Sequence, residues 1–557
     1  MNNSTRRTAA ALLPLSATAL TLAALAGCSN PLRALPEDYG EAVPKARLVE
    51  VEPLSLIERP AELPEELAPP EPFADTDRVE LALDQARAFT LEGNLDLRVA
   101  LISPAAAGQS LREQEAAWEA VFSVDARWNN TDQPTASDLA GAQTDFRAVT
   151  PQIRVPLRTG GNFDVRLPFT RNSTNNDFAT LNPSFTTDFE FSISQPLLRG
   201  AGREVNTHAL RVASYQEGIE LARTKLEVIR QLSNVDRSYW RLFAVHRALD
   251  VARQQYDLAV TQYERAVRLH DNGRTAEIEV TRAEEGVAQR LEDIIRTHNE
   301  VKLRQRDLKR VMNAPQFDLQ ELPILWPASD PTPLPLDLQP DRLTRIALDQ
   351  RMELLELELQ LATDASTIAL RENEELPNFT LDYTYRINGL GDNIANSSDV
   401  LTDVDFEDWI VALRFDTPIG NNAAKARTAR AVIDRLQRLS TRDARRQAIE
   451  QEVRNAVDAI DDGWQRILAS RQSAILAGRT LEAEQRQFGV GRSTTTDVLD
   501  AATRLADAQL AEIRALTEYQ IAQVDLAFAT GSVLGSAMVE WDTIDPRSDS
   551  YTGTTER

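Results

Sequence analysis

The sequence predicts an α+β protein that is internally duplicated, with each copy joining short strands to a very long helical hairpin. A Pro-rich stretch at 315–340 divides the chain into halves, and the same order of signals occurs in both. In each half, an opening segment with the apolar spacing of a helix is followed by residues that alternate at every second position, as in strands, and then by a long stretch with helical spacing of three and four. At 557 residues the chain is long enough for several ordinary cores or for one very elongated molecule, and length alone does not choose between them.

The first residues resemble the export signal of a bacterial lipoprotein. Arg6 and Arg7 precede an apolar stretch at 9–26, which is short and Ala-rich for a permanent membrane span. The stretch leads into Leu-Ala-Gly-Cys, and Cys28 is the only cysteine, so it has no partner for an internal disulfide. We therefore expect 1–27 to be a signal peptide that is removed and Cys28 to carry the lipid, palmitate included. A chance cysteine after an ordinary signal peptide is the alternative.

Pro-rich segments mark the boundaries of the predicted organisation. Residues 31–74 are rich in Pro and Glu, which indicates an extended linker. The residue after the cysteine is Ser29 rather than Asp, as in lipoproteins that are sorted to the bacterial outer membrane. We predict a signal peptide at 1–27, a lipidated N-terminal linker at 28–74, a first repeat at 75–314, a Pro-rich connector at 315–340, a second repeat at 341–535 and a C-terminal tail at 536–557.

Each repeat opens with a predicted helix. Asp77 and Glu80 have the spacing of a capping box at the start of the first helix, and Asp341 precedes the second. The four residues that begin at Asn94 correspond to the four that begin at Arg351, Asn-Leu-Asp-Leu against Arg-Met-Glu-Leu. The two copies therefore correspond in position and in apolar pattern at this point.

Strands follow the opening helix in each repeat. Alternating residues predict strands at 379–385 and 409–415 in the second repeat, and at 124–128 and 189–193 in the first. The first repeat has two further candidates within 152–170, which we expect to form a projecting hairpin rather than part of the main sheet. Each strand has one apolar face and one largely polar face.

A soluble sandwich also gives alternating strands, but the flanking helices are far too long to fold over so few strands. A couple of strands per half make no closed core by themselves. Several chains can form a closed structure if they combine their strands into one barrel, with the aromatic faces toward lipid and the polar faces toward water. We therefore expect an α+β membrane protein.

Very long helices come next, at about 202–270 and 422–487. At 1.5 Å per residue each would reach about 100 Å. Both break at glycine and continue as a return helix. Aligning Gly273 with Gly491 also aligns Arg274 with Arg492 and Glu279 with Asp497. Two helical hairpins with matched tips are expected.

Composition excludes several classes of function. The 61 Lys and Arg residues against 85 Asp and Glu residues give a net charge of −24, which would repel nucleic acid. The four histidines have no metal-ligand spacing, and the sequence contains no HExxH, P-loop or GxSxG motif. We expect no enzyme, no metal site and no cofactor.

The segment 488–501 and the helix after it, to about residue 531, resemble the second tip of the TolC-like outer-membrane efflux factors. The turn at 195–200, Gln-Pro-Leu-Leu-Arg-Gly, resembles the strand-to-helix turn of a subset of that family. The resemblance covers roughly 75–535. It implies a homotrimer in which each chain gives about four strands to a shared transmembrane β-barrel. It also implies an exit duct for efflux or type I export, whose helical tips meet a periplasmic adaptor bound to an inner-membrane pump.

The resemblance further implies a periplasmic gate at the second tip. The two Asp residues of the family's constriction match Asp497 and Asp500, whose i, i+3 spacing puts both carboxylates on one helix face. Threefold repetition would ring the entrance with carboxylates that hold cations and disfavour anions. Charge stabilisation of the helix N-terminus is the alternative reason for these residues.

The closed state of the family is latched by an aromatic hydroxyl and an arginine near this tip. Phe488 matches the aromatic position but lacks a hydroxyl, and Ser493 stands at the arginine position. Glu279 matches the acidic partner on the first tip. We predict that Arg492 or Arg274 supplies the missing cation. The predicted adaptor-contact residues are those of the two turns: Gly273, Arg274, Gly489 and Gly491.

A lipid-anchored periplasmic coiled-coil adaptor is the alternative function. It accounts for Cys28 and the long helices, but it leaves the paired aromatic strands and the duplication unexplained. The sequence names no cargo.

Overall fold

The computed structural model describes residues 69–71, 73, 78–136, 141–319, 322–490 and 492–541. The chain divides into two units, Met1–Leu67 and Ala68–Arg557, and every described residue belongs to the second. The predicted signal peptide, Cys28 and Ser29 lie outside the described residues. So do nearly all of the linker, Asp77, Gly491 and the end of the C-terminal tail.

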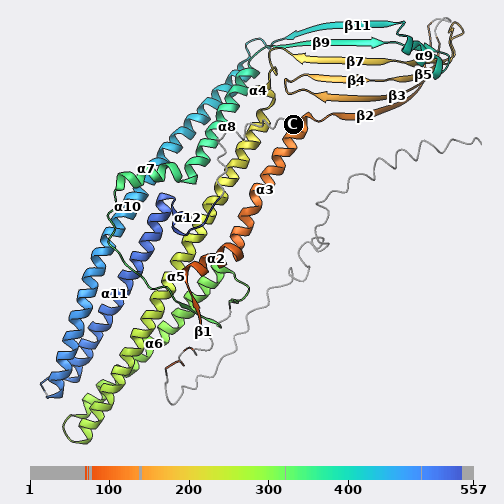
Figure 1. Ribbon diagram of the computed structural model, residues 1–557. Coiled ribbons are helices and arrows are strands. Elements are labelled where there is room, and N and C mark those ends of the chain that lie inside the picture. Colours follow the sequence, from red (N-terminus) through yellow and green to blue (C-terminus); the bar gives the residue numbers. More distant parts are fainter. Residues whose placement is uncertain are drawn as a thin grey trace, which may run out of the picture. The chain divides into compact units, whose positions relative to one another are not determined.

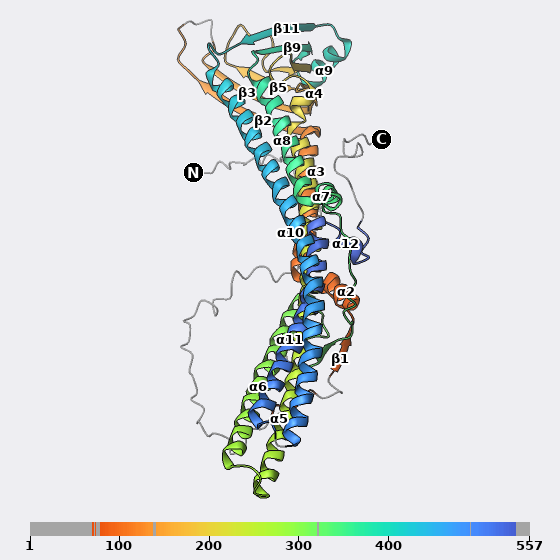
Figure 2. The same ribbon diagram turned by 90° about the vertical axis from the view of Figure 1, so that its left-hand side faces the viewer.

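Two long helical hairpins form the elongated part of this unit (Figure 1). The first consists of α5 (His208–Asp271) and α6 (Glu277–Met312), and the second of α10 (Asn422–Gly489) and α11 (Thr495–Thr530). Helices α5 and α10 contain 64 and 68 residues, so each extends for about 100 Å. This confirms the expected long helices. The hairpins lie side by side, and α5 packs against α11 (Figure 2).

Shorter helices connect the hairpins to the sheet. Helices α3 (Leu95–Glu115) and α8 (Met352–Glu374) both pack on α5, and α8 also packs on α10. Each is preceded by an 11-residue helix, α2 (Leu83–Gly93) or α7 (Pro340–Gln350). The described residues also form three short α-helices, α4 (Arg203–Asn206), α9 (Ile394–Asp403) and α12 (Val533–Ser536), and a 3-10 turn at Ala116–Trp118.

The start of the first repeat differs from the prediction. Residues expected in the opening helix form β1 (Arg78–Leu81), which pairs in parallel with β8 (Ile324–Pro327) of the Pro-rich connector. Glu80 therefore lies in a strand, and no helix starts at the predicted capping box. The strand is stabilised because Leu81 is buried and its carbonyl accepts a hydrogen bond from Tyr239 of α5 at 2.9 Å. These partners are distant in sequence, so local spacing does not reveal them.

A large antiparallel sheet stands at one end of the helices (Figure 1). Across it β2 pairs with β3, β3 with β4 and β5, β4 with β7, β7 with β9, and β9 with β11, while β6 pairs with β5 and β10. The strands are β2 (Val121–Asp132), β3 (Gln143–Pro156), β4 (Asn162–Arg166), β5 (Phe169–Thr174), β6 (Ser184–Thr187), β7 (Phe189–Pro196), β9 (Asn378–Ile387), β10 (Leu390–Gly391) and β11 (Glu407–Asp416).

Two expectations about the sheet are wrong. The described part of the chain contributes nine strands rather than about four, and the segment 152–170 joins the sheet between β2 and β7 instead of projecting as a hairpin. The reason is register: Ile153 pairs with Val165, and Val165 pairs with Phe191. The apolar residues of the extra strands thus continue the apolar row of their neighbours.

The two faces of the sheet differ in chemistry. We define the apolar face as the one that carries a row of six paired residues, one each from β2, β3, β4, β7, β9 and β11, and the polar face as the other. Trp409 and Phe122 at the two ends of that row are 67% and 66% exposed, which is unusual for large apolar side chains. The row is Phe122, Ile153, Val165, Phe191, Tyr385 and Trp409.

The polar face contains ion pairs between neighbouring strands. Glu190 of β7 receives Arg166 of β4 at 3.2 Å and Arg386 of β9 at 3.0 Å. Arg154 and Asp164 form another pair at 2.7 Å. The alternation predicted from the sequence is therefore confirmed, with one apolar and one polar face. Among the helices that the structure describes, none is both long enough and apolar enough to cross a membrane.

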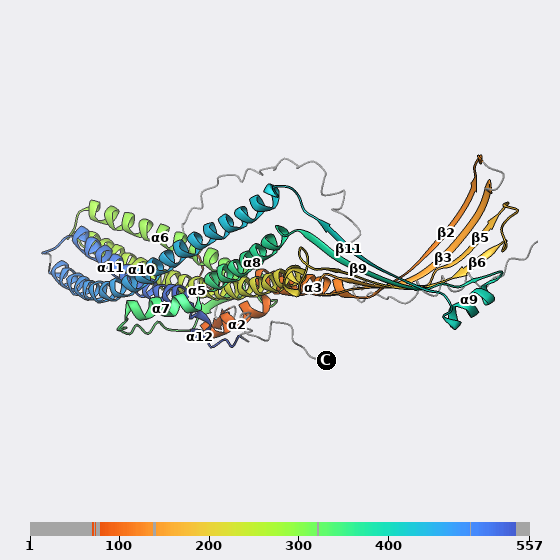
Figure 3. The ribbon, with the colours of Figure 1, turned by 90° about the horizontal axis from the view of Figure 1, so that it is seen from above.

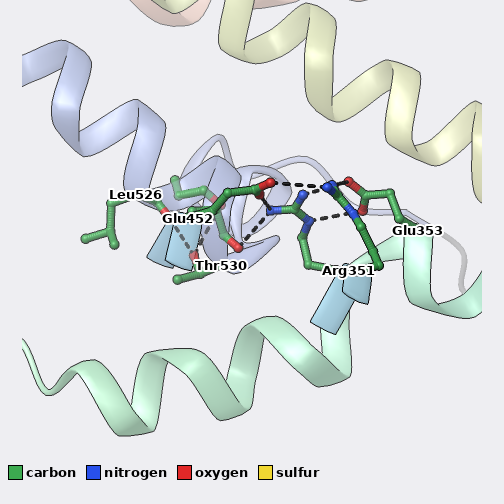
Figure 4. A network of polar contacts seen from close by, with 8 residues as sticks. Arg351, Glu353, Glu452, Leu526 and Thr530 are labelled. Atoms are coloured by element: carbon green, nitrogen blue, oxygen red, sulfur yellow. Dashed lines mark hydrogen bonds and ion pairs between the residues drawn. The ribbon is translucent and has the colours of Figure 1, made fainter. Parts of the chain in front are cut away.

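Each return helix ends where an opening helix breaks. In the second repeat, Arg351 caps α8, and its side chain is only 3% exposed. It pairs with Glu353 at 2.7 Å and Glu452 at 2.9 Å and donates to the carbonyl of Ala529 at 3.1 Å (Figure 4). Arg445 also contacts both glutamates, so the four side chains form one ionic network.

Candidate functional site

The first hairpin tip reverses through a glycine in the left-handed conformation. Helix α5 ends at Asp271, and Gly273 has a φ of 67°. The amide of Gly273 donates to the carbonyl of His270 at 2.7 Å, and that of Arg274 donates to Leu269 at 2.8 Å. Only glycine adopts this φ without a steric cost, so Gly273 is explained first by the turn itself.

The second tip is closed by a side-chain cap. Helix α10 ends at Gly489, and the amide of Arg492 donates back to the carbonyl of Gln487 at 3.0 Å. Thr494 caps α11, and one oxygen of Asp497 accepts from the Thr494 amide at 2.8 Å and from its hydroxyl at 2.7 Å. The Thr494 hydroxyl oxygen accepts in turn from the Asp497 amide at 3.3 Å. The cap satisfies helix N-terminal groups that would otherwise lack partners.

The cap favours the ionised form of Asp497. The hydrogen bond from the Thr494 backbone, followed by those from the hydroxyls of Thr494 and Ser493, lowers the pKa of this carboxyl below its usual value. Asp497 thus stabilises the N-terminus of α11, which was the alternative reason given for this residue. Its charge nevertheless remains exposed to solvent.

Asp500 lies one turn further along α11 on the same exposed side. The opposite side of this turn is buried, where Val498, Ala501 and Ala502 pack against Leu481 of α10. Packing therefore fixes which face of the helix turns outward. It leaves the two carboxylates together at the start of α11.

Phe488 makes a contact that the sequence did not reveal. The guanidinium of Arg265 on α5 lies 4.8 Å from the centre of the Phe488 ring, a cation–π geometry. A Cβ added to Gly489 would lie 3.3 Å from an Arg265 nitrogen, so the glycine leaves room for the arginine. Arg265, eight residues before Gly273, thus places a cation beside the matched aromatic residue. A search for arginines within two turns of either tip would have included it. That Arg492 or Arg274 supplies the latch cation stays a prediction.

Glu279 is engaged within its own helix. One of its oxygens pairs with Arg282 of α6 at 2.7 Å. Further along α6, Arg290 donates to the hydroxyl of Thr503 on α11, and a Cβ on Gly286 would lie 3.3 Å from the Leu499 side chain. The return helices of the two hairpins therefore touch close to the tips.

The predicted site residues fall into two groups. The second tip brings together Asp497, Asp500, Phe488, Gly489 and Arg492, and the first tip carries Gly273, Arg274 and Glu279. Across the described ranges, no group of three or more His, Cys, Asp or Glu side chains is placed to hold a metal ion.

Residues 343–532 match the family described as outer membrane efflux protein. The outer membrane protein TolC of Vibrio cholerae serotype O1 is 28% identical over 198 residues, which is 35% of this chain and 44% of that protein. The chain thus spans less than half the length of this curated relative. The resemblance to the TolC-like family is confirmed for the second half of the chain.

Solved outer-membrane channels share the fold over most of the chain. The channel OprN gives a TM-score of 0.60 at 16% identity, covering 81% of this chain and 90% of its own. Campylobacter jejuni CmeC gives 0.58 at 14% identity, with 81% and 85% covered. The open state of Neisseria gonorrhoeae MtrE gives 0.56 at 15% identity, with 81% and 89% covered. The described unit has the fold of these channels.

Proposed function

We propose that this protein is the outer-membrane exit duct of a tripartite efflux or type I export system, a passive conduit across the periplasm and the outer membrane. The observation that carries the proposal is the junction of 64- and 68-residue helices with a sheet whose apolar face is exposed. A sheet with such a face needs lipid or protein to cover it. Helices of this length suit the crossing of a periplasm.

In the proposed assembly, three copies close the sheet into one barrel. Within the described chain, β2 pairs only with β3 and β11 only with β9, so each keeps an open edge. Pairing of β2 in one copy with β11 in the next would satisfy both edges, as a membrane barrel requires. The apolar face would meet lipid, and the paired charges of the polar face would meet water. The acylated Cys28 anchors the mature N-terminus.

The tips form the proposed periplasmic gate. Threefold repetition gathers Asp497 and Asp500 around a narrow entrance that favours cations. Contact between Arg265 and Phe488 holds the hairpins together in the closed state. The turns at Gly273, Arg274, Gly489 and Gly491 meet the hairpins of a periplasmic adaptor that binds an inner-membrane pump.

Fractionation and native mass test the assembly. We expect a trimer that requires detergent and that sediments with the outer membrane. A Cys28→Ala variant is the matched control, because it lacks the acyl chain but keeps the strands, and it should remain a detergent-requiring trimer. A monomer that leaves the membrane once the acyl chain is absent would contradict the duct and support an adaptor.

Conductance in planar bilayers tests the gate. Asp497→Asn with Asp500→Asn should reduce cation selectivity, because the ring loses its charge. Asp507→Asn, on the same helix about 10 Å deeper, is the control and should change selectivity less. Equal selectivity in all variants would remove Asp497 and Asp500 from the gate.

A further inference from the structure

The arginines of the large sheet are divided unequally between its two faces. Five of the seven in its described strands lie on the polar face, where Arg154, Arg166 and Arg386 have carboxylate partners on neighbouring strands. The other two, Arg147 and Arg171, lie on the apolar face. Their place follows from register: Arg147 stands an even number of residues before Ile153 along β3 and so shares its face, and Arg171 pairs directly with Arg147.

Arg147 and Arg171 belong to a single row across four strands. Trp128 of β2 pairs with Arg147 of β3, Arg147 pairs with Arg171 of β5, and Arg171 pairs with Phe185 of β6. We name this row the arginine row. Two guanidinium groups are thus held next to each other with an aromatic side chain at either end. Trp128 is 68% exposed, and the Arg147 side chain is 53% exposed.

The arginine row lies where the apolar band of the sheet ends. Toward the helices, the same face carries Val149 and Ile153 of β3, which are 41% and 44% exposed. In the next row away from the helices come Asp145, Asn130 and Ser173. Trp128 is seven residues from the start of β2, or about 23 Å of strand, and these strands run to the far end of the sheet (Figure 3). The row therefore marks an apolar-to-polar boundary remote from the helices.

Asp145 orients both guanidinium groups without neutralising them. It pairs with Arg147 at 3.0 Å and with Arg171 at 3.5 Å. One carboxylate against two guanidiniums leaves one positive charge on a face that otherwise carries apolar and aromatic residues at this level. Guanidinium groups bind phosphate oxygens in a bidentate manner, and aromatic residues flank the headgroup region of membrane barrels.

We propose that the arginine row binds phosphate groups of lipids in the outer leaflet of the outer membrane. The inference rests on the proposed function, because it takes the apolar face as the lipid-facing one and the far end of the sheet as the outer end. The occupant follows from charge complementarity and from the continuity of the row with the apolar band. Acyl chains lie against the band, while the phosphates reach the two guanidiniums at its edge.

Binding of fluorescent bisphosphorylated lipid A to the detergent-solubilised trimer tests the proposal, with dephosphorylated lipid A as the comparison probe. We expect the Arg147→Gln, Arg171→Gln double variant to bind the phosphorylated lipid roughly tenfold more weakly, and the dephosphorylated lipid no differently. Arg127→Gln is the matched control, since it adjoins Trp128 but lies on the polar face, and it should bind as the unmodified protein does. Inorganic phosphate should not displace the lipid at the same concentration.

Asp145→Asn gives a second test that does not remove the arginines. Loss of the shared carboxylate should tighten binding of the phosphorylated lipid several-fold, because both guanidiniums become available. Unchanged binding in the double variant, or an equal loss in Arg127→Gln, would overturn the proposal. Displacement of the lipid by inorganic phosphate would also overturn it, as would weaker binding of the phosphorylated lipid by the Asp145→Asn variant. Failure to obtain a detergent-requiring trimer would instead count against the duct itself, and native mass separates the two results.

Discussion

In each repeat, the opening helix breaks and a second helix begins at a capping residue. The backbone arrangement at this junction is the same in both repeats, but the side chain that caps the second helix differs. Asn94 caps α3 and donates to the carbonyl of Val311 at 2.8 Å, and Arg351 caps α8 and donates to the carbonyl of Ala529 at 3.1 Å. Positions 311 and 529 differ by 218, as do the tip glycines at 273 and 491. Equivalent carbonyls therefore receive hydrogen bonds from a short neutral side chain in one copy and from a long charged one in the other.

The space around the two caps differs accordingly. Beside Asn94 is a polar pocket of about 420 Å³, lined in part by Asp96, Asn234 and Val311. At the matching place of the second repeat, the guanidinium of Arg351 and its glutamate partners occupy the junction. The duplication thus conserves where the chain must break and be capped. It does not conserve what fills the gap.

The largest expected effect is the loss of the Arg351 network. Arg351→Ala removes the buried guanidinium that pairs with Glu353 and Glu452, and should cost about 3 kcal/mol in the free energy of unfolding, at the lower end for a broken buried pair because both glutamates keep Arg445. Asn94→Ala removes a neutral cap and should cost only about 1 kcal/mol. Urea unfolding of the purified protein measures both, with the exposed Arg345→Ala as control. Equal losses at the two junctions would show that the chemical difference has no energetic weight.

Acid should weaken the second junction alone. Burial by itself would raise the pKa of Glu353, but its hydrogen bonds and charge contact with Arg351 outweigh this and lower the pKa to about 2. A carboxyl with a lowered pKa stabilises the fold above its unfolded value of 4.5, and this contribution disappears as the pH falls toward 2. The difference amounts to roughly 3 kcal/mol.

Unfolding curves between pH 5 and pH 2 check this dependence. Glu353→Gln should be less stable than the unmodified protein at neutral pH and should flatten the acid limb. Asn94→Ala should keep the full acid dependence. An acid limb that is the same with and without Glu353 would refute the assignment.

A smaller effect is expected at the ends of the return helices. Gly531 caps α11 with a φ of 75°, and a Cβ there would lie 3.2 Å from that of Gln350. The equivalent residue, 218 positions earlier, is Asn313 with a φ of 44°. Gly531→Ala should cost about 1–2 kcal/mol in unfolding free energy, and Gly531→Asn should cost less because Asn tolerates this conformation better. The reverse order would mean that space, rather than backbone conformation, limits the position.

The smallest effect on stability should come from the contact between the tips. Arg265→Ala removes a partly exposed cation–π pair with Phe488 and should cost about 0.5–1 kcal/mol. Its consequence should instead appear in planar-bilayer conductance, where the closed state should conduct more. Arg274→Ala and Arg492→Ala are the matched controls from the two turns. If one of them raises conductance and Arg265→Ala does not, the latch belongs to that residue.

Local periodicity was sufficient to predict the long elements. Helices expected at about 202–270 and 422–487 are His208–Asp271 and Asn422–Gly489, and strands expected at 379–385 and 409–415 lie within β9 and β11. These segments have a regular apolar spacing along their whole length, so neighbours in the sequence carry the information.

Elements that depend on distant partners were not predicted. Strand β1 forms because β8, 246 residues later, pairs with it. The segment 152–170 enters the sheet because its apolar residues fall into register with β7. Arg265 lies beside Phe488 only because α5 and α10 come together near their tips.

The sequence by itself determined the duplication, the positions of the helix breaks and the amphipathic strands, because spacing, glycine and proline act on the nearest residues. The tertiary structure alone decided which residues meet across the repeats. It made Asp497 both a helix cap and an exposed charge. It also placed Arg351 in the junction of the second repeat and left a pocket beside Asn94 in the first. Such outcomes depend on the side chains that packing brings together from remote segments, which no local pattern records.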